Sequence, residues 1–235
     1  MQIKNTHIGY TSSLFHIGEL ELKTGQLYAL IGANGKGKST LLKTAVGEIS
    51  PLSGKVLVND QTIESYSNQA KSKIIGLVNS RFAGISYMKA EEYVALGRIP
   101  HTNAFGRLTK HDNDIINACF DYLSIQHLRD KFTLELSDGE KQMLAIAKVL
   151  AQETPYILLD EPTAFLDYKN KQAVLNLLKE IARTQNKCIV LSSHDLELTI
   201  KNVDTLLCIP SKKNELEVLS ASSARLDEIV ANCFN

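Results

Sequence analysis

The chain has 235 residues, and its 26 lysines and arginines are balanced by 26 aspartates and glutamates. A chain of this length can bury a large core in one domain, and its zero net charge provides no field that would attract nucleic acid or anionic lipid. No apolar stretch is long enough to span a bilayer, and residues 1–7 lack the apolar segment of a signal peptide. We therefore expect one domain over residues 1–235, in the cytoplasm, without a nucleic-acid partner.

The four cysteines lie far apart, without the C-x-x-C spacing of a metal or redox site. Two of them fall in apolar, strand-like runs, which favours buried, reduced thiols over disulfides or metal ligands. The cysteines are Cys119, Cys188, Cys208 and Cys233.

Short strands are the first predicted elements. Residues 3–10 and Lys55–Val58 have the pattern of strands in a small β-layer, and a turn at 50–54 introduces the second. Leu27–Ile31 is a continuous apolar run, typical of a buried strand, and a further strand is predicted at Ile74–Val78.

A glycine-rich loop follows the run Leu27–Ile31. Its residues, which fit the pattern G-x-x-x-x-G-K-[ST], are Gly32, Ala33, Asn34, Gly35, Lys36, Gly37, Lys38, Ser39 and Thr40. The apolar residues beyond it have helical spacing, so the loop joins a strand to the start of a helix. Such a loop curls its backbone N–H groups around phosphates, and the helix N-terminus adds partial positive charge.

The phosphate-loop pattern predicts roles for two side chains. Lys38 is expected to reach the β- and γ-phosphates of a nucleoside triphosphate, and the Ser39 hydroxyl is expected to ligate magnesium. The alternative is an ordinary glycine turn before a helix.

The middle of the chain, from about residue 85 to 150, becomes helical and more polar, which predicts a subdomain inserted into the core. Lys110–Leu128 carries its apolar residues on one helical face. Beyond this region, apolar runs at Tyr156–Leu159, Cys188–Leu191 and Thr205–Ile209 alternate with helical or turn segments. Strands that alternate with helices predict an α/β fold with a mostly parallel sheet.

Two carboxylate residues, Asp160 and Glu161, directly follow the apolar run Tyr156–Leu159. In a phosphate-binding protein, a buried strand of this kind places Asp160 beside magnesium, and Glu161 then orients or deprotonates the attacking water. Paired acids after a strand can also form a solvated turn. The phosphate loop upstream favours the functional interpretation.

The segment Leu136-Ser137-Asp138-Gly139-Glu140 begins a predicted helix. Ser137 can cap that helix, with Glu140 completing a capping box. The segment also resembles the LSGGQ signature of ATP-binding-cassette (ABC) ATPases, in the variant LSDGE. Its place between the phosphate loop and the carboxylate-ended strand is specific to that family. The resemblance implies a P-loop core with a mostly parallel sheet, a small antiparallel β-subdomain and an inserted helical subdomain.

The resemblance to ABC ATPases covers nearly the whole chain and implies further roles. Asp167 lies in a segment similar to the D-loop, and His194 resembles the switch histidine that contacts the γ-phosphate. Tyr10 resembles the aromatic residue that stacks on adenine, and it could equally be a strand-end tyrosine. The family binds ATP with Mg²⁺ and pairs head to tail. The signature residues of one copy are then expected to close over ATP on the other; they are Ser137, Asp138, Gly139 and Glu140.

Three positions depart from the family pattern. Ser80, preceded by Asn79, stands where the Q-loop glutamine touches magnesium, and either side chain can supply an oxygen with shorter reach. Asp138 replaces a glycine; a carboxylate in contact with triphosphate is repelled by roughly 1–4 kcal/mol per charge pair, so we expect its side chain to point away. Lys36 replaces a small residue and adds positive charge beside the phosphates. Because Lys38, Asp160 and Glu161 are present, an active ATPase is expected.

The stretch Val94–His101, with Phe105–Leu108, resembles ATPases that serve importers of ferric siderophores, haem and cobalamin. The alternative is a helix that ends at Gly97 with a basic loop beyond. The resemblance implies a subunit on the cytoplasmic face of the membrane, bound to permease subunits and acting indirectly with a substrate-binding protein. Two other interpretations stay open: the motor of another ABC transporter, including an exporter, and a soluble ABC ATPase outside transport.

Overall fold

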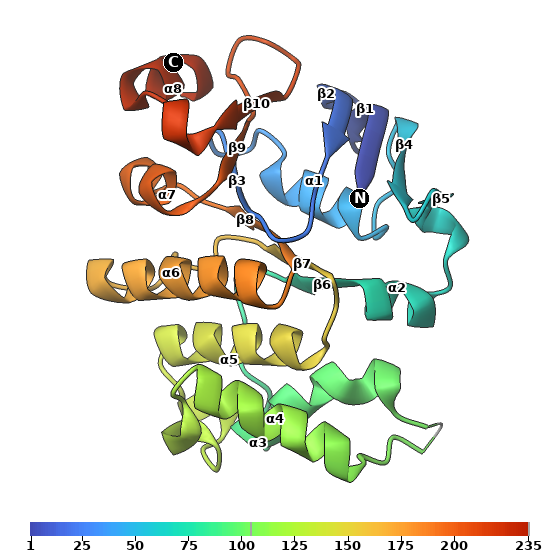
Figure 1. Cartoon of the computed structure of the whole chain (residues 1–235), viewed down its shortest axis with the longest axis vertical. Coiled ribbons are helices and arrows are strands. Elements are labelled where there is room, and N and C mark those ends of the chain that lie inside the picture. The colour runs from blue at the N-terminus through green and yellow to red at the C-terminus, as the bar shows by residue number, and fades with distance from the viewer. Residues whose placement is uncertain (104, 235) are drawn as a thin grey trace.

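The computed structural model describes residues 1–103 and 105–234, which form two β-sheets and a set of helices (Figure 1). The strands are β1 (Gln2–Gly9), β2 (Ser13–Glu21), β3 (Leu27–Ile31), β4 (Ser53–Val58), β5 (Gln61–Thr62), β6 (Ile75–Val78), β7 (Tyr156–Leu159), β8 (Cys188–Ser192), β9 (Thr205–Cys208) and β10 (Glu217–Ser220). The α-helices are α1 (Lys38–Ala45), α2 (Asn68–Ile74), α3 (Ala90–Ala95), α4 (Lys110–Tyr122), α5 (Asp138–Ala151), α6 (Tyr168–Thr184), α7 (Leu196–Asn202) and α8 (Leu226–Cys233).

The larger sheet has the strand order β10-β9-β3-β8-β7-β6. Its strands pair in parallel except for β10, which runs antiparallel to β9 at the edge. Strands β3 and β8 are buried along their whole length, as expected for parallel strands covered on both faces. The prediction of an α/β fold with a mostly parallel sheet is confirmed.

The smaller sheet is antiparallel, in the order β2-β1-β4-β5. The predicted strands at 3–10 and Lys55–Val58 correspond to β1 and β4. The sequence analysis missed β2, which pairs with β1 along its length. The alternating buried residues Phe15 and Ile17 are the signal that would have identified it.

Alternation along the strands divides the apolar core between the two faces of the larger sheet. Leu27, Ala29 and Ile31 of β3 belong to the cluster beneath α5 and α6, whereas Tyr28 and Leu30 belong to the cluster shared with α1 and the small sheet. This period of two follows from the pleat of the strand. No helix in the part of the chain that the structure describes has the length and the hydropathy needed to cross a membrane.

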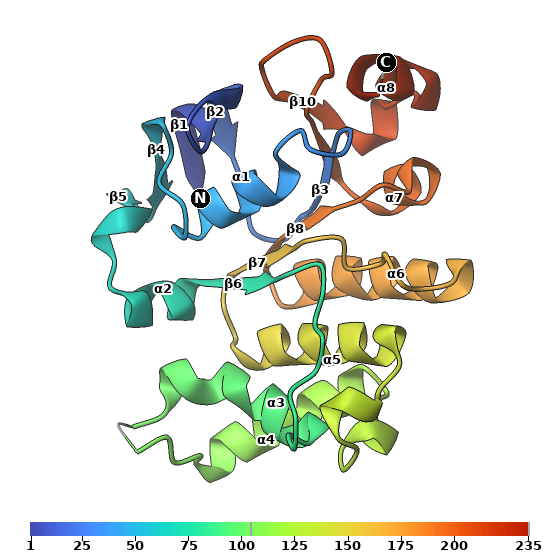
Figure 2. The ribbon, with the colours of Figure 1, turned by 180° about the vertical axis from the view of Figure 1, so that it is seen from behind.

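Helices α3, α4 and α5 follow β6 and precede β7, and they lie together beyond the β6 edge of the large sheet (Figures 1 and 2). The predicted helix Lys110–Leu128 is shorter in the structure, because α4 ends at Tyr122 and Ser124 takes a left-handed backbone conformation (φ 56°). The strand predicted at Ile74–Val78 begins one residue later, since Ile74 closes helix α2.

The residues after α3 form a short 3₁₀ helix, Leu96–His101, and not the basic loop considered as an alternative. Arg98 within it is 2% exposed. Its Nε donates to Asp112 Oδ1 at 2.9 Å, and its guanidinium also donates to Ala151 O at 2.6 Å and to Glu153 Oε2 at 2.8 Å. This arginine therefore joins the start of α4 to the end of α5.

Candidate active site

Three neighbouring strands of the large sheet bring the candidate site together. β3 leads into the glycine loop and α1, β7 ends at Asp160 and Glu161, and β8 ends shortly before His194. Since β3, β8 and β7 are adjacent and parallel, their carboxyl ends lie at one edge of the sheet. In open α/β sheets this edge is where ligands bind.

The glycine loop turns sharply at Gly37, which precedes α1 with a φ of 97°. A Cβ at this position would lie 2.9 Å from Leu14 Cδ1 and 3.1 Å from Phe15 Cε1, so both the backbone conformation and the packing require glycine. Asn34, Gly35 and Ser39 are exposed. The loop therefore presents its backbone and the Ser39 hydroxyl outward at the start of a helix.

Lys38 is 5% exposed, and its Nζ donates to the carbonyls of Gly32 at 2.8 Å and Ala33 at 3.2 Å. Burial lowers the pKa of Lys38, and the nearby Glu161 and Asp160 carboxylates oppose that effect. The Lys38 ammonium thus lies near two carboxylates. It donates its hydrogen bonds to neutral carbonyls, which a phosphate oxygen can replace as acceptors.

Lys36 takes part in a contact that the sequence did not indicate. Its Nζ donates to Ser211 O at 2.9 Å, and the Ser211 backbone N–H donates to Asn232 O at 2.9 Å. The ammonium that was expected only to add charge beside the phosphates also joins the glycine loop to the C-terminal segment.

Ser192 connects the two carboxylate residues after β7. Its hydroxyl donates to Asp160 Oδ1 at 2.7 Å and accepts the Glu161 backbone N–H at 2.8 Å. Glu161 has a left-handed backbone conformation (φ 49°), which is strained for a non-glycine residue and recurs at functional sites. Sequence analysis did not identify Ser192; a polar residue that ends the apolar strand β8 is the available signal.

His194 and Glu161 meet at the mouth of the site, where His194 Nε2 lies 2.5 Å from Glu161 Oε1. Both side chains are about one-third exposed. The structure therefore brings together Lys38, Asp160, Glu161 and His194 from the glycine loop and the ends of β7 and β8.

The signature segment belongs to a different part of the surface. Ser137 caps α5: its hydroxyl accepts the Glu140 N–H, and the Glu140 carboxylate accepts the Ser137 N–H at 2.8 Å. These hydrogen bonds lower the pKa of Glu140. The Asp138 side chain is 68% exposed and lies 3.9 Å from Lys141, so it points to solvent. Within the described residues, no hydrogen bond joins this segment to the glycine loop.

The remaining predicted residues lie at the start of α6 and after β6 and β1. Asp167 caps α6 by accepting the Asn170 N–H at 2.8 Å, and its neighbour Leu166 lies against Gly139 of the signature. Ser80 follows β6, whose Val78 carbonyl accepts the Asp160 N–H at 2.8 Å. Tyr10 is 61% exposed in the turn after β1.

The candidate magnesium ligands offer hydroxyl and carboxylate oxygens, which are the ligands that Mg²⁺ prefers. They are Ser39, Ser80 and Asp160. The described residues hold no group of three or more His, Cys, Asp and Glu side chains placed for a metal.

A glycine loop between a parallel strand and a helix, with carboxylates at the end of a nearby strand, defines a P-loop nucleotide-hydrolysing protein. The sequence model of the family described as "ABC transporter" matches residues 15–164. The chain therefore belongs to the ABC transporter family, and it is an ATPase that binds ATP.

Relatives and solved structures agree with this assignment. The chain is 36% identical over 214 residues to an uncharacterized ABC transporter ATP-binding protein of Methanocaldococcus jannaschii, covering 91% of this chain and 74% of that protein. It is 34% identical over 194 residues to the ferric enterobactin transport ATP-binding protein FepC of Escherichia coli, covering 83% and 72%. A solved ABC transporter described as metal-chelate type, in an inward-facing conformation, is 29% identical with a TM-score of 0.83, covering 98% and 87%.

Proposed function

We propose that this chain is the ATP-hydrolysing subunit of an importer for a metal chelate of the iron-siderophore, haem or cobalamin type, acting through separate permease subunits. The observation that supports hydrolysis is the meeting of Lys38, Glu161 and His194 at the ends of β3, β7 and β8. The support for the substrate class is the similarity to a ferric enterobactin transport protein and to a metal-chelate type transporter.

In this proposal, Lys38 moves its hydrogen bonds from the Gly32 and Ala33 carbonyls to the β- and γ-phosphates of ATP. Glu161 accepts a proton from the attacking water, and His194, in contact with Glu161, also contacts the γ-phosphate. Ser192 holds Asp160 and the Glu161 backbone in place. Ser39 and Asp160 would hold Mg²⁺, which would supply Lewis-acid stabilisation of the developing charge. Tyr10 and Ser80 are proposed contacts of adenine and of the metal site.

We also propose that two copies pair head to tail around ATP. Ser137 and Gly139 at the N-terminus of α5 offer a hydroxyl and backbone N–H groups, which suit an anion. Asp167, whose neighbour Leu166 lies against Gly139, is the proposed D-loop residue of such a dimer.

We propose that the chain acts at the cytoplasmic face of the cell membrane, where permease subunits would bind it. A substrate-binding protein is the indirect partner on the other side. The other candidate roles, an exporter motor or a soluble ABC ATPase, predict different gene neighbours: a many-helix permease and a binding lipoprotein encoded nearby support import.

An uptake assay tests the proposal. A strain lacking this gene is given iron–siderophore, haem and cobalamin in turn, and the deletion is complemented with the unaltered gene or with Glu161→Gln. Uptake of one substrate is expected to fall and to return only with the unaltered gene. Unchanged uptake of all three substrates would reject the importer proposal.

A further inference from the structure

The segment that follows β9 packs against the glycine loop. β9 lies next to β3 in the large sheet, and the Ile209 N–H donates to Ile31 O at 2.8 Å, at the end of β3. A Cβ on Gly32 would lie 3.1 Å from both Ile209 Cβ and Ile209 O, so the first residue of the loop is in close contact with Ile209. Ile209 is itself buried. The glycine loop is therefore supported by the C-terminal part of the chain.

Lys36 adds a second contact between the same two segments. Its Nζ donates to Ser211 O at 2.9 Å, a charge-assisted hydrogen bond, which is stronger than one between neutral groups. Lys36 stands between Gly35 and Gly37, whose φ values of 76° and 97° lie in the left-handed region that favours glycine. Because glycine has more backbone freedom than other residues, this part of the loop loses the most entropy when it is ordered. The Lys36 side chain thus anchors the loop where its backbone has the largest freedom.

Helix α8 holds Ser211 from the other side. The Ser211 N–H and hydroxyl both donate to Asn232 O, at 2.9 Å and 3.3 Å. Asn232 Nδ2 donates to Glu217 Oε2 of β10 at 2.6 Å, and Ile229 of α8 is buried in the core. Figures 1 and 2 show α8 beside β10. The carbonyl that accepts the Lys36 hydrogen bond therefore belongs to a residue that an anchored helix keeps in place.

We propose that Lys36 is a positioning residue for nucleotide binding. Through Ser211 it joins the glycine loop to helix α8, so that the affinity of the loop for ATP depends on the C-terminal segment. A loop that is held in shape before the nucleotide arrives binds it more tightly, because less backbone entropy is lost on binding. The small residue of the family pattern has no ammonium for this bond, so the link belongs to the residues of this chain. The inference does not depend on which substrate is transported.

Calorimetric titration of the full-length chain with ADP and with the non-hydrolysable analogue AMP-PNP tests the inference. Lys36→Met keeps the alkyl stem and removes the donor, and we expect its Kd for both nucleotides to rise about fivefold or more, the scale of one hydrogen bond to a charged group. Lys36→Arg keeps a cationic donor that can reach the Ser211 carbonyl. Its Kd should therefore stay within about twofold of that of the unaltered chain.

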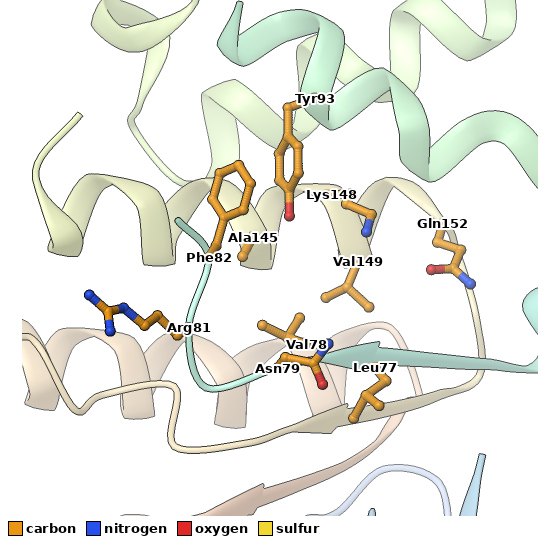
Figure 3. A pocket seen from close by; sticks show the side chains of 10 residues that line it. All are labelled: Leu77, Val78, Asn79, Arg81, Phe82, Tyr93, Ala145, Lys148, Val149 and Gln152. Atoms are coloured by element: carbon orange, nitrogen blue, oxygen red, sulfur yellow. The ribbon is translucent and has the colours of Figure 1, made fainter. Parts of the chain in front are cut away.

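Steady-state kinetics separate the shape of the loop from the chemical step. Lys36→Met should raise KM for ATP and leave kcat within about twofold, because Lys38, Glu161 and His194 are unaltered. Lys148→Met is the matched control. This lysine is also half-buried, and it lies on α5 near the end of β6 (Figure 3), at the edge of the large sheet opposite to β10. Its Kd for nucleotide should equal that of the unaltered chain.

Amide hydrogen exchange measures the link to α8 directly. Because coupling between two sites is reciprocal, a nucleotide that prefers the anchored loop must also stabilise the anchor. We expect AMP-PNP to slow exchange over residues 209–217 and 226–234 of the unaltered chain, and to change it little in Lys36→Met. Asn232→Ala removes the bond to Glu217. It should raise the Kd of the unaltered chain and add little to Lys36→Met, since both substitutions act on one link.

An unchanged Kd in Lys36→Met would overturn the inference, and so would additive effects of Lys36→Met and Asn232→Ala. Faster exchange over residues 209–217 with AMP-PNP would also overturn it, because Lys36 would then leave Ser211 for a phosphate. A fall in kcat at constant KM would place Lys36 in the chemical step instead. Urea unfolding without nucleotide verifies that each variant folds.

Discussion

His194 Nε2 and Glu161 Oε1 lie 2.5 Å apart, although the two residues are 33 positions apart in the sequence. Glu161 follows β7 and His194 follows β8, so their contact depends on the parallel pairing of these two strands. Glu161 has a left-handed backbone, and its N–H donates a hydrogen bond to the Ser192 hydroxyl. Together they fix the direction in which the Glu161 side chain extends from the end of β7. This pair places a carboxylate and an imidazole side by side at the carboxyl ends of β7 and β8.

Replacement of Glu161 by glutamine is expected to abolish ATP turnover, because the amide cannot accept the proton of the attacking water. Phosphate release measures turnover, and size-exclusion chromatography with ATP measures pairing, which should survive the substitution. Glu197→Gln, an exposed position on α7, is the control. Undiminished hydrolysis in Glu161→Gln would remove Glu161 from the role of base.

Ser192→Ala tests the residue that sequence analysis missed. Ser192 is fully buried, and its loss leaves Asp160 Oδ1 and the Glu161 N–H without this partner, at a cost of about 1–3 kcal/mol of stability. Because both carboxylates then shift, we expect kcat to fall at least about tenfold. Steady-state kinetics and urea unfolding provide the two measurements. A variant with normal kcat and lowered stability would show that Ser192 serves only the fold.

Arg98→Met is expected to destabilise the chain by about 3–5 kcal/mol, because it leaves the buried Asp112 carboxylate without its cation. The methionine preserves most of the side-chain volume. Urea unfolding followed by circular dichroism measures the change, with Arg107→Met at an exposed position as the comparison. A loss below about 1 kcal/mol would mean that Thr109 alone stabilises Asp112.

The lowered pKa of Asp112 predicts that the stability of the fold depends on pH. Hydrogen bonds from the Thr109 hydroxyl and backbone, together with Arg98, lower the pKa of Asp112 from 3.8 to about 2. A carboxyl whose pKa is lower in the folded state stabilises the fold above its unfolded pKa and loses that contribution as the pH falls through the folded value. The stability difference between the unaltered chain and Asp112→Asn should therefore be full at pH 7 and shrink between pH 3.8 and about 2.

Asp114→Asn, at an exposed position on the same helix, is the matched control for the removal of one carboxylate. If Asp112→Asn showed the same stability difference at every pH, the hydrogen bonds to Asp112 would not be specific for its ionised form.

Local sequence predicted the elements that short-range chemistry decides. The glycine loop follows from the backbone conformation that Gly37 permits, and the buried strands β3, β7 and β8 follow from continuous apolar runs. The capping box of Ser137 and Glu140 was also predicted, because it joins residues three positions apart. The strand β2 was missed because its formation depends on pairing with β1. Helix α4 was predicted too long because the left-handed backbone at Ser124 ends it.

The sequence by itself determined that the chain carries a phosphate loop, paired carboxylates after a strand and an ABC signature, since each of these is a run of adjacent residues. Only the tertiary structure decided which side chains meet. Ser192 reaches Asp160, Arg98 reaches Asp112 and Glu153, and Tyr93 and Lys148 share a cavity with the end of β6. These contacts join residues on different strands and helices, and their distances depend on sheet order and helix packing, which no local pattern of residues encodes.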